Sequence, residues 1–234
     1  TIAFQGEVEH RDSVGNGGVI GPGDVQWMTA GRGIIHEEYH STKFAKNGGT
    51  FEMCQLWLNL PAKHKMDPPR YQPILSHDIP EVELPGDAGA KARLIAGSLF
   101  DTKGPAQTMT PVELWDVSIS EPHKVVEFPI PSGHSVIVFV RRGGIIVGDG
   151  DDGFKESKHA QLGPQAVAIL GRSANHKENL KSSFQVMASQ KDTAIIILGG
   201  EPLNEPIAAR GPFVMNTHEE IMQANRDYMY GRMG

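Results

Sequence analysis

The sequence is poor in cysteine and has no long hydrophobic run. Its 234 residues contain one cysteine, Cys54, so no disulfide bond can form within the chain. A lone cysteine is typical of a reducing compartment, and we expect a cytoplasmic protein, or a nuclear one in a eukaryote. The longest apolar runs, such as SVIVFV and TAIIIL, are too short to cross a bilayer. The sequence therefore predicts no membrane segment.

Basic charge is also scarce. Lysine and arginine number 22 against 28 aspartates and glutamates, which gives a net charge of −6. Without a basic run or a basic amphipathic face, we expect no direct contact with nucleic acid or with an anionic membrane. Glycine (27) and proline (16) are abundant instead. Spread along the chain, they break it into short segments, which favours an all-β protein with many turns.

The order of these segments predicts two similar domains and a tail. A Gly-Pro step leads into an apolar strand that ends in Gly-Arg twice, at residues 31–32 and 171–172, as expected for two copies of one β-barrel unit. A proline-rich stretch over 61–90 is predicted to connect them. The expected segments are an N-terminal domain, a C-terminal domain and a C-terminal tail: 1–75, 76–200 and 201–234.

The tail contains one clear helix signal. Thr217 and Glu220 stand at the spacing of a capping box, in which each side chain binds the other residue's backbone N–H. Apolar residues follow at helical spacing until Gly231. The sequence therefore predicts a helix over 218–229.

The stretch HEEYH, residues 36–40, matches the zinc-protease pattern H-E-x-x-H, which requires a helix. Gly31 and Gly33 precede it, and each glycine costs about 1 kcal/mol in a helix relative to alanine. We therefore predict a strand, which puts His36 and Glu38 on one face. Imidazole and carboxylate are ligands that suit non-haem iron and related metals. A surface His–Glu pair would explain the same letters.

Three longer stretches together resemble the pirin family of bicupins. They are HRDSVGNGGVIGPGDVQWMTAGRGIIHEE, QLWLNLPAKHKMDPPRYQ and EPLNEPIAARGPFVMNTHEEI, in this order along the chain. The resemblance implies two cupin β-barrels of the RmlC-like jelly-roll type, packed together, with a C-terminal helix. It is weaker between about residues 90 and 195.

The resemblance also implies one divalent transition metal in the N-terminal barrel, usually Fe(II), with Mn, Ni, Co, Cu and Zn as alternatives. Its ligands carry over onto His36 and Glu38. The resemblance places the family's other two ligands, a His-x-His pair, upstream of Thr1. The opening letters TIAFQGEVEH are typical of a strand already under way, so we expect the chain to begin inside a domain. Position 40 is not a family ligand, so the H-E-x-x-H match is interpreted as accidental.

Two functions are compatible with this resemblance. Bacterial relatives resemble quercetin 2,3-dioxygenases, which implies a small aromatic substrate, O2, and Glu38 as both ligand and catalytic base. Other family members are interaction proteins that regulate a transcription factor or an enzyme. We expect a monomer in either case.

Further residues are candidates for the substrate pocket. His10 and Asp12 alternate on a predicted strand and share a face, and Trp57 could face the cavity or pack in the core. A second H-x-E, at His176 and Glu178, lies in a polar, loop-like segment. We interpret neither it nor the acidic turn GDGDDG as a metal site.

Overall fold

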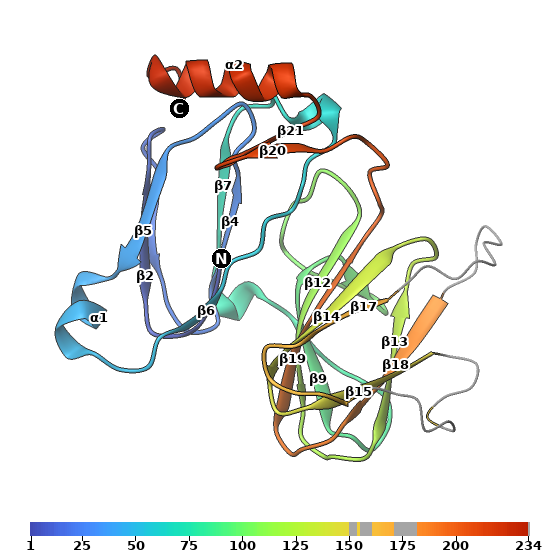
Figure 1. The fold of residues 1–234 in the computed structure, drawn as a ribbon. Coiled ribbons are helices and arrows are strands. Elements are labelled where there is room, and N and C mark those ends of the chain that lie inside the picture. Colours follow the sequence, from blue (N-terminus) through green and yellow to red (C-terminus); the bar gives the residue numbers. More distant parts are fainter. Residues whose placement is uncertain (150–153, 155–160, 171–181, 234) are drawn as a thin grey trace. The chain divides into compact units, whose positions relative to one another are not determined.

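The computed structural model describes residues 1–149, 154, 161–170 and 182–233, and the chain divides into two compact units (Figure 1). The N-terminal domain consists of Thr1–Asp78 and Leu203–Gly234, and the C-terminal domain of Ile79–Pro202. Strands dominate both, which confirms the predicted all-β class. The three segments expected from the sequence stay a prediction. Among the described residues, no helix has the length and apolar character needed to cross a membrane.

The N-terminal domain is built on two antiparallel sheets. One has the strand order β6-β1-β4-β7, and the other β3-β2-β5. Their bounds are β1 Ile2–Gln5, β2 Val8–Asp12, β3 Gly17–Ile20, β4 Val25–Thr29, β5 His36–His40, β6 Glu52–Cys54 and β7 Arg70–Ile74. A short helix, α1 (Thr42–Asn47), follows β5, and the Ser41 hydroxyl caps it by accepting a hydrogen bond from the Phe44 N–H. Short 3-10 turns lie at Ala62–His64 and Ser76–Asp78.

The C-terminal tail belongs to the N-terminal domain. It forms a hairpin, β20 (Ala208–Arg210) and β21 (Phe213–Met215), followed by α2 (His218–Met229), which lies next to the hairpin in Figure 1. The predicted helix and its capping box are both confirmed. Buried Lys65 anchors the hairpin by donating to the backbone carbonyl of Val214 at 3.2 Å.

The C-terminal domain contains the larger apolar core. Its two main sheets have the orders β17-β14-β19-β12-β9-β8 and β13-β18-β15-β16, with a small hairpin of β10 and β11. The bounds are β8 Glu81–Glu83, β9 Ala90–Ala96, β10 Ser98–Leu99, β11 Thr102–Lys103, β12 Val112–Ile119, β13 Val125–Ile130, β14 Ser135–Arg142, β15 Ile145–Asp149, β16 Gln161–Leu162, β17 Val167–Leu170, β18 Ser182–Ala188 and β19 Thr193–Gly200. Alternate residues of these strands, such as Trp115, Val117 and Ile119 on β12, pack into one core.

The structure differs from the sequence interpretation in the segment 55–74. The predicted connector contains a strand, β7, paired with β4. Pro73 lies on an edge strand, the place in a sheet where proline is tolerated because the outward-facing N–H groups have no ladder partner. The predicted long strand FEMCQLWLNL is short, since β6 ends at Cys54. Trp57 lies beyond it and is 70% exposed, so it does not pack in the core.

Candidate metal centre

The strand pair β2–β5 brings the candidate residues together. HEEYH forms β5, as predicted, and pairs antiparallel with β2 in the register His10↔Glu38 and Asp12↔His36. Residues two apart on a strand share a face, so these four side chains lie on one face of the sheet. The turn before β5 depends on Gly31, which has a positive φ of 53° and would place a Cβ only 2.1 Å from the Asp67 carbonyl oxygen.

Three of these residues could hold one metal ion. Each of His10, His36 and Glu38 offers a ligand atom, and these atoms all lie within 4.8 Å of one another. The ring centroids of the two histidines are 5.5 Å apart. Two imidazoles and a carboxylate are a donor set that suits divalent transition metals, so the residues fit the implied group. From the sequence, His10 is predicted to line the substrate pocket; only the strand pairing shows how near it lies to Glu38.

Glu38 is surrounded by hydrogen-bond donors. Its Oε1 atom accepts from the Gln26 amide at 2.8 Å and from the Thr1 hydroxyl at 3.1 Å. Its Oε2 atom accepts from the Gln55 amide at 2.8 Å. None of these three donors is a candidate from the sequence. A signal was present for Gln26, because an amide in the middle of the apolar strand VQWMT must find partners once that strand is buried.

His10 is fully buried and held from several directions. The Gln26 amide donates to its Nδ1 at 2.9 Å, and its Nε2 lies 3.5 Å from Asp12 Oδ2. Its ring stacks on Tyr71, with centroids 5.0 Å apart and an interplanar angle of 15°. Burial, and then the nearby carboxylates of Glu38 and Asp12, raise the pKa of the Tyr71 phenol. Neither Gln26 nor Tyr71 was a candidate from the sequence.

Asp12 is fixed by the turn that follows β2. Burial by itself raises the pKa of its carboxyl, but hydrogen bonds from Asn16, His10 and Val14 outweigh burial and hold the pKa below its usual value. The Asn16 bonds are 2.8 Å from the backbone N–H and 2.9 Å from the side-chain amide. Asp12 therefore faces His10 as a carboxylate.

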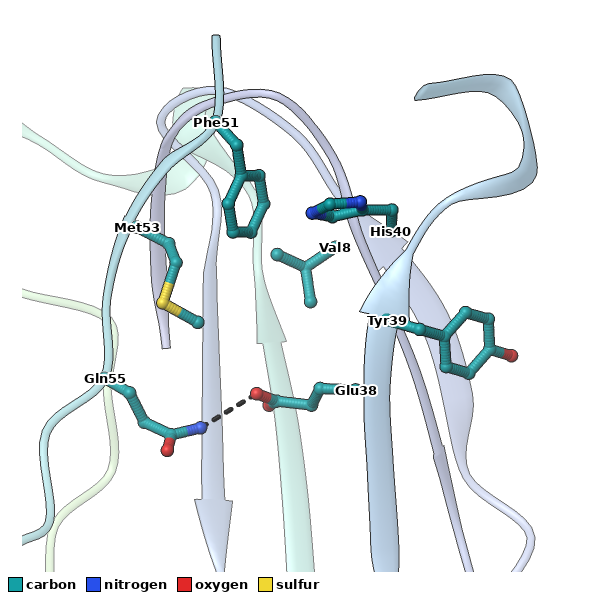
Figure 2. A pocket seen from close by; sticks show the side chains of 7 residues that line it. All are labelled: Val8, Glu38, Tyr39, His40, Phe51, Met53 and Gln55. Atoms are coloured by element: carbon teal, nitrogen blue, oxygen red, sulfur yellow. Dashed lines mark hydrogen bonds between the residues drawn. The ribbon is translucent and has the colours of Figure 1, made fainter. Parts of the chain in front are cut away.

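A cavity of about 440 Å³ opens beside Glu38. Its lining residues are Val8, Glu38, Tyr39, His40, Phe51, Met53 and Gln55. Figure 2 shows Glu38 and Gln55 pointing toward one another, while the Tyr39 ring points away from them on the other side of β5. Trp57, predicted as a pocket residue, is not part of this lining.

His40 completes the accidental H-E-x-x-H match but lies apart from the metal group. Its ring packs edge-on against Phe44 and Phe51, at centroid distances of 5.3 and 4.6 Å. It forms part of the cavity wall, and no helix contains it. The second H-x-E, His176 and Glu178, and residues 150–153 of the acidic turn lie outside the described residues.

Comparison with known proteins agrees with the two-domain β fold. The Pirin family matches residues 1–58, and the Pirin C-terminal cupin domain matches residues 114–234. A Pseudomonas aeruginosa protein named "Putative quercetin 2,3-dioxygenase" is 48% identical over 99% of this chain and 74% of its own length. A pirin-like protein of Solanum lycopersicum is 37% identical over 100% of this chain and 72% of its own length. The crystal structure of quercetin 2,3-dioxygenase from Acinetobacter baumannii superposes with a TM-score of 0.87 at 45% identity, covering 100% of this chain and 74% of that one.

The fold and the site together define a two-domain cupin protein with a group of residues able to hold a metal ion in its N-terminal domain. The length and identity of the matches make the family certain. The chain belongs to the pirin family.

Proposed function

We propose that this protein is a metal-dependent dioxygenase of the quercetin 2,3-dioxygenase type, which uses O2 to cleave a flavonol or another enolisable aromatic compound. The observation that carries the proposal is the cavity that opens beside Glu38, since a closed site would favour a purely regulatory role. The name of the 48% identical relative supports the same reaction class.

The residues of this chain that would hold the metal are His36 and Glu38, with His10 in the same group. Neutral imidazole and carboxylate suit Fe(II) first, and Mn, Ni, Co, Cu or Zn as alternatives. A metal bound there supplies a Lewis acid that orients the oxygen of an enol or phenol toward O2.

The protein's own groups account for substrate binding and proton transfer. The cavity volume is in the range of small-molecule sites, and Val8, Phe51 and Met53 give it apolar walls for an aromatic ring. Glu38 stands at its polar end, where its carboxylate can accept the proton of the substrate hydroxyl. Gln55 holds that carboxylate from the cavity side.

The test is turnover of quercetin. Purified protein is loaded with Fe(II) without oxygen and then given quercetin and O2, and the flavonol absorbance and O2 uptake are followed together. We expect both to fall, and no loss of absorbance with any divalent metal would exclude this substrate. Glu38→Gln should reduce turnover by at least about 100-fold. The matched control is Glu37→Gln, the exposed neighbour that points to the other face of β5.

A second candidate is a regulatory protein that binds a partner through its surface. It is favoured by two adjacent apolar side chains, Trp57 and Leu58, which are 70% and 51% exposed. Metal-loaded protein that leaves a panel of flavonols unchanged would favour this role over the dioxygenase. We further propose that the protein acts as a monomer in the cytoplasm.

A further inference from the structure

We propose that Gln26 is a positioning residue: it ties His10 to the Glu38 carboxylate and keeps His10 itself off the metal. The proposal rests on the proposed function in one respect, namely that Glu38 holds a metal. It divides the three residues of the metal group into two ligands, His36 and Glu38, and one hydrogen-bonding support, His10.

Gln26 donates both of its amide hydrogens within this site, one to His10 and one to Glu38. Its side chain is 3% exposed, and Nε2 lies 2.9 Å from His10 Nδ1 and 2.8 Å from Glu38 Oε1. The opposite amide orientation would place Oε1 2.8 Å from the Glu38 carboxylate oxygen, which accepts hydrogen bonds and cannot donate one, so the two oxygens would repel each other. The orientation is therefore fixed by chemistry.

This orientation leaves a buried acceptor unsatisfied. Gln26 Oε1 has no hydrogen-bond partner among the described residues. A buried carbonyl without a partner costs stability, and an apolar side chain on β4 would avoid the cost. A glutamine held in this way indicates a role in the site rather than in packing.

The bond from Gln26 determines the state of His10. Because Nδ1 accepts a hydrogen bond, the ring proton of the neutral imidazole lies on Nε2. Nε2 faces the Asp12 carboxylate at 3.5 Å, and the Asn16 and Val14 bonds keep Asp12 in place. One ring nitrogen is thus occupied and the other protonated, so neither offers a lone pair to a metal.

The consequence for Glu38 is that its two oxygens differ. Oε1 is held by Gln26 from the buried side, on the strand β4. Oε2 is held by Gln55, which lines the cavity. The chain Asp12–His10–Gln26–Glu38 therefore sets the carboxylate plane and directs Oε2 toward the cavity. Hydrogen bonds of this outer kind orient ligands and raise metal affinity.

The first test is nitrogen-15 NMR of the histidine side chains in the metal-free protein. We expect the wild type to show His10 protonated at Nε2, with Nδ1 as an acceptor. Gln26→Met, of similar length but without the amide, should give a mixture of the two tautomers. The matched control is Gln5→Met, which removes an exposed amide–carboxylate bond of 2.9 Å to Glu52 and should leave the His10 signals unchanged.

The second test is Co(II) binding, followed by calorimetry and by the visible spectrum. Gln26→Met should weaken binding about tenfold and alter the visible bands, while Gln5→Met changes neither. His10→Gln, which can still accept from Gln26, should cost less than about tenfold, against at least about 100-fold for His36→Gln. The His10 variant also provides an answer if Gln26→Met does not fold.

Several outcomes would overturn the proposal. A proton on His10 Nδ1 in the metal-free wild type would remove the link, and a Co(II) affinity of His10→Gln as low as that of His36→Gln would make His10 a ligand. If Gln26→Met changes neither the His10 tautomer nor the Co(II) affinity, Gln26 is not a positioning residue and the proposal also fails. If the wild type binds no Co(II), the proposed function fails, while the NMR measurement still decides whether Gln26 fixes His10.

Discussion

The interiors of the two domains differ in chemistry although both are built from antiparallel strands. In the C-terminal domain, β12, β13 and β14 turn apolar side chains inward, among them Trp115, Phe128 and Val138, all fully buried. In the N-terminal domain, β2 and β4 bury His10 and Gln26 beside the apolar Val8 and Val25. Buried polar groups lower stability unless they are hydrogen-bonded, so a strand face that carries several of them indicates a site.

The C-terminal domain also contains a buried histidine–carboxylate pair, and the contrast is informative. His134 Nδ1 lies 2.7 Å from Glu113 Oε2, and both side chains are buried. Gly199 packs so closely that a Cβ there would lie 2.7 Å from the same oxygen. In the N-terminal domain, Glu38 instead lines a cavity, and His10 lies next to a second histidine, His36. Histidine and glutamate side chains thus form a buried structural pair in one domain and a candidate metal-ligand set in the other, because their surroundings differ.

The largest expected effect distinguishes a core phenylalanine from a cavity phenylalanine. Phe128 is fully buried and stacks on Phe184 at 5.3 Å, so Phe128→Ala should lower the free energy of unfolding by about 3–5 kcal/mol. Phe51 lines the cavity and is 39% exposed, so Phe51→Ala should cost about 1 kcal/mol or less. Urea denaturation measures both.

The order of the two effects should reverse in substrate binding. Phe51→Ala removes an apolar wall and should weaken quercetin binding about three- to tenfold, whereas Phe128→Ala should leave binding by the folded fraction unchanged. Equal losses of stability in the two variants would contradict the distinction between a packed interior and a cavity wall.

The intermediate effect is stabilisation by metal. A metal at 100 times its Kd adds about 2.7 kcal/mol to the stability of the state that binds it. We expect Co(II) to raise the melting temperature of the wild type and not that of His36→Ala. His134→Ala is the control: its starting stability should be lower, because Glu113 loses its partner, but the gain from metal should remain. A gain retained by His36→Ala would move the site elsewhere.

The smallest effect concerns pH and the tail of the N-terminal domain. Backbone hydrogen bonds from Asn216 and Thr217 hold the pKa of the Glu220 carboxyl below its usual value. The folded state therefore binds this proton less readily than the unfolded chain. The stabilisation is fully present above the usual pKa of a glutamate and is lost as pH falls through the lower folded value.

Glu220→Gln should accordingly flatten the dependence of unfolding free energy on pH as the pH falls below the usual pKa of a glutamate, about 4.3, measured by urea denaturation at each pH. Glu219→Gln, in the same first turn of α2 and outside the capping box, is the control and should leave the slope as in the wild type. An unchanged slope in the Glu220 variant would show that the Glu220 carboxylate contributes nothing to the pH dependence of stability.

The sequence by itself determined the local features of the fold, which depend on residues close together in the chain. Alternating and turn residues predicted the all-β class, Thr217 and Glu220 the start of α2 and Gly231 its end, and the glycines before HEEYH favoured a strand there. Each of these signals depends on backbone preferences within a few positions, so no knowledge of distant contacts is needed.

The tertiary structure decided which residues meet. Gln26 lies 16 positions from His10 and 12 from Glu38. Its strand, β4, belongs to one sheet and β2 and β5 to the other, so its hydrogen bonds cross from one sheet to the other, and only the packing of the sheets brings these residues together. Trp57 is exposed because β6 ends at Cys54, before the chain reaches it. Strand pairing and strand length are set by the total burial of the domain, which no short window of sequence contains.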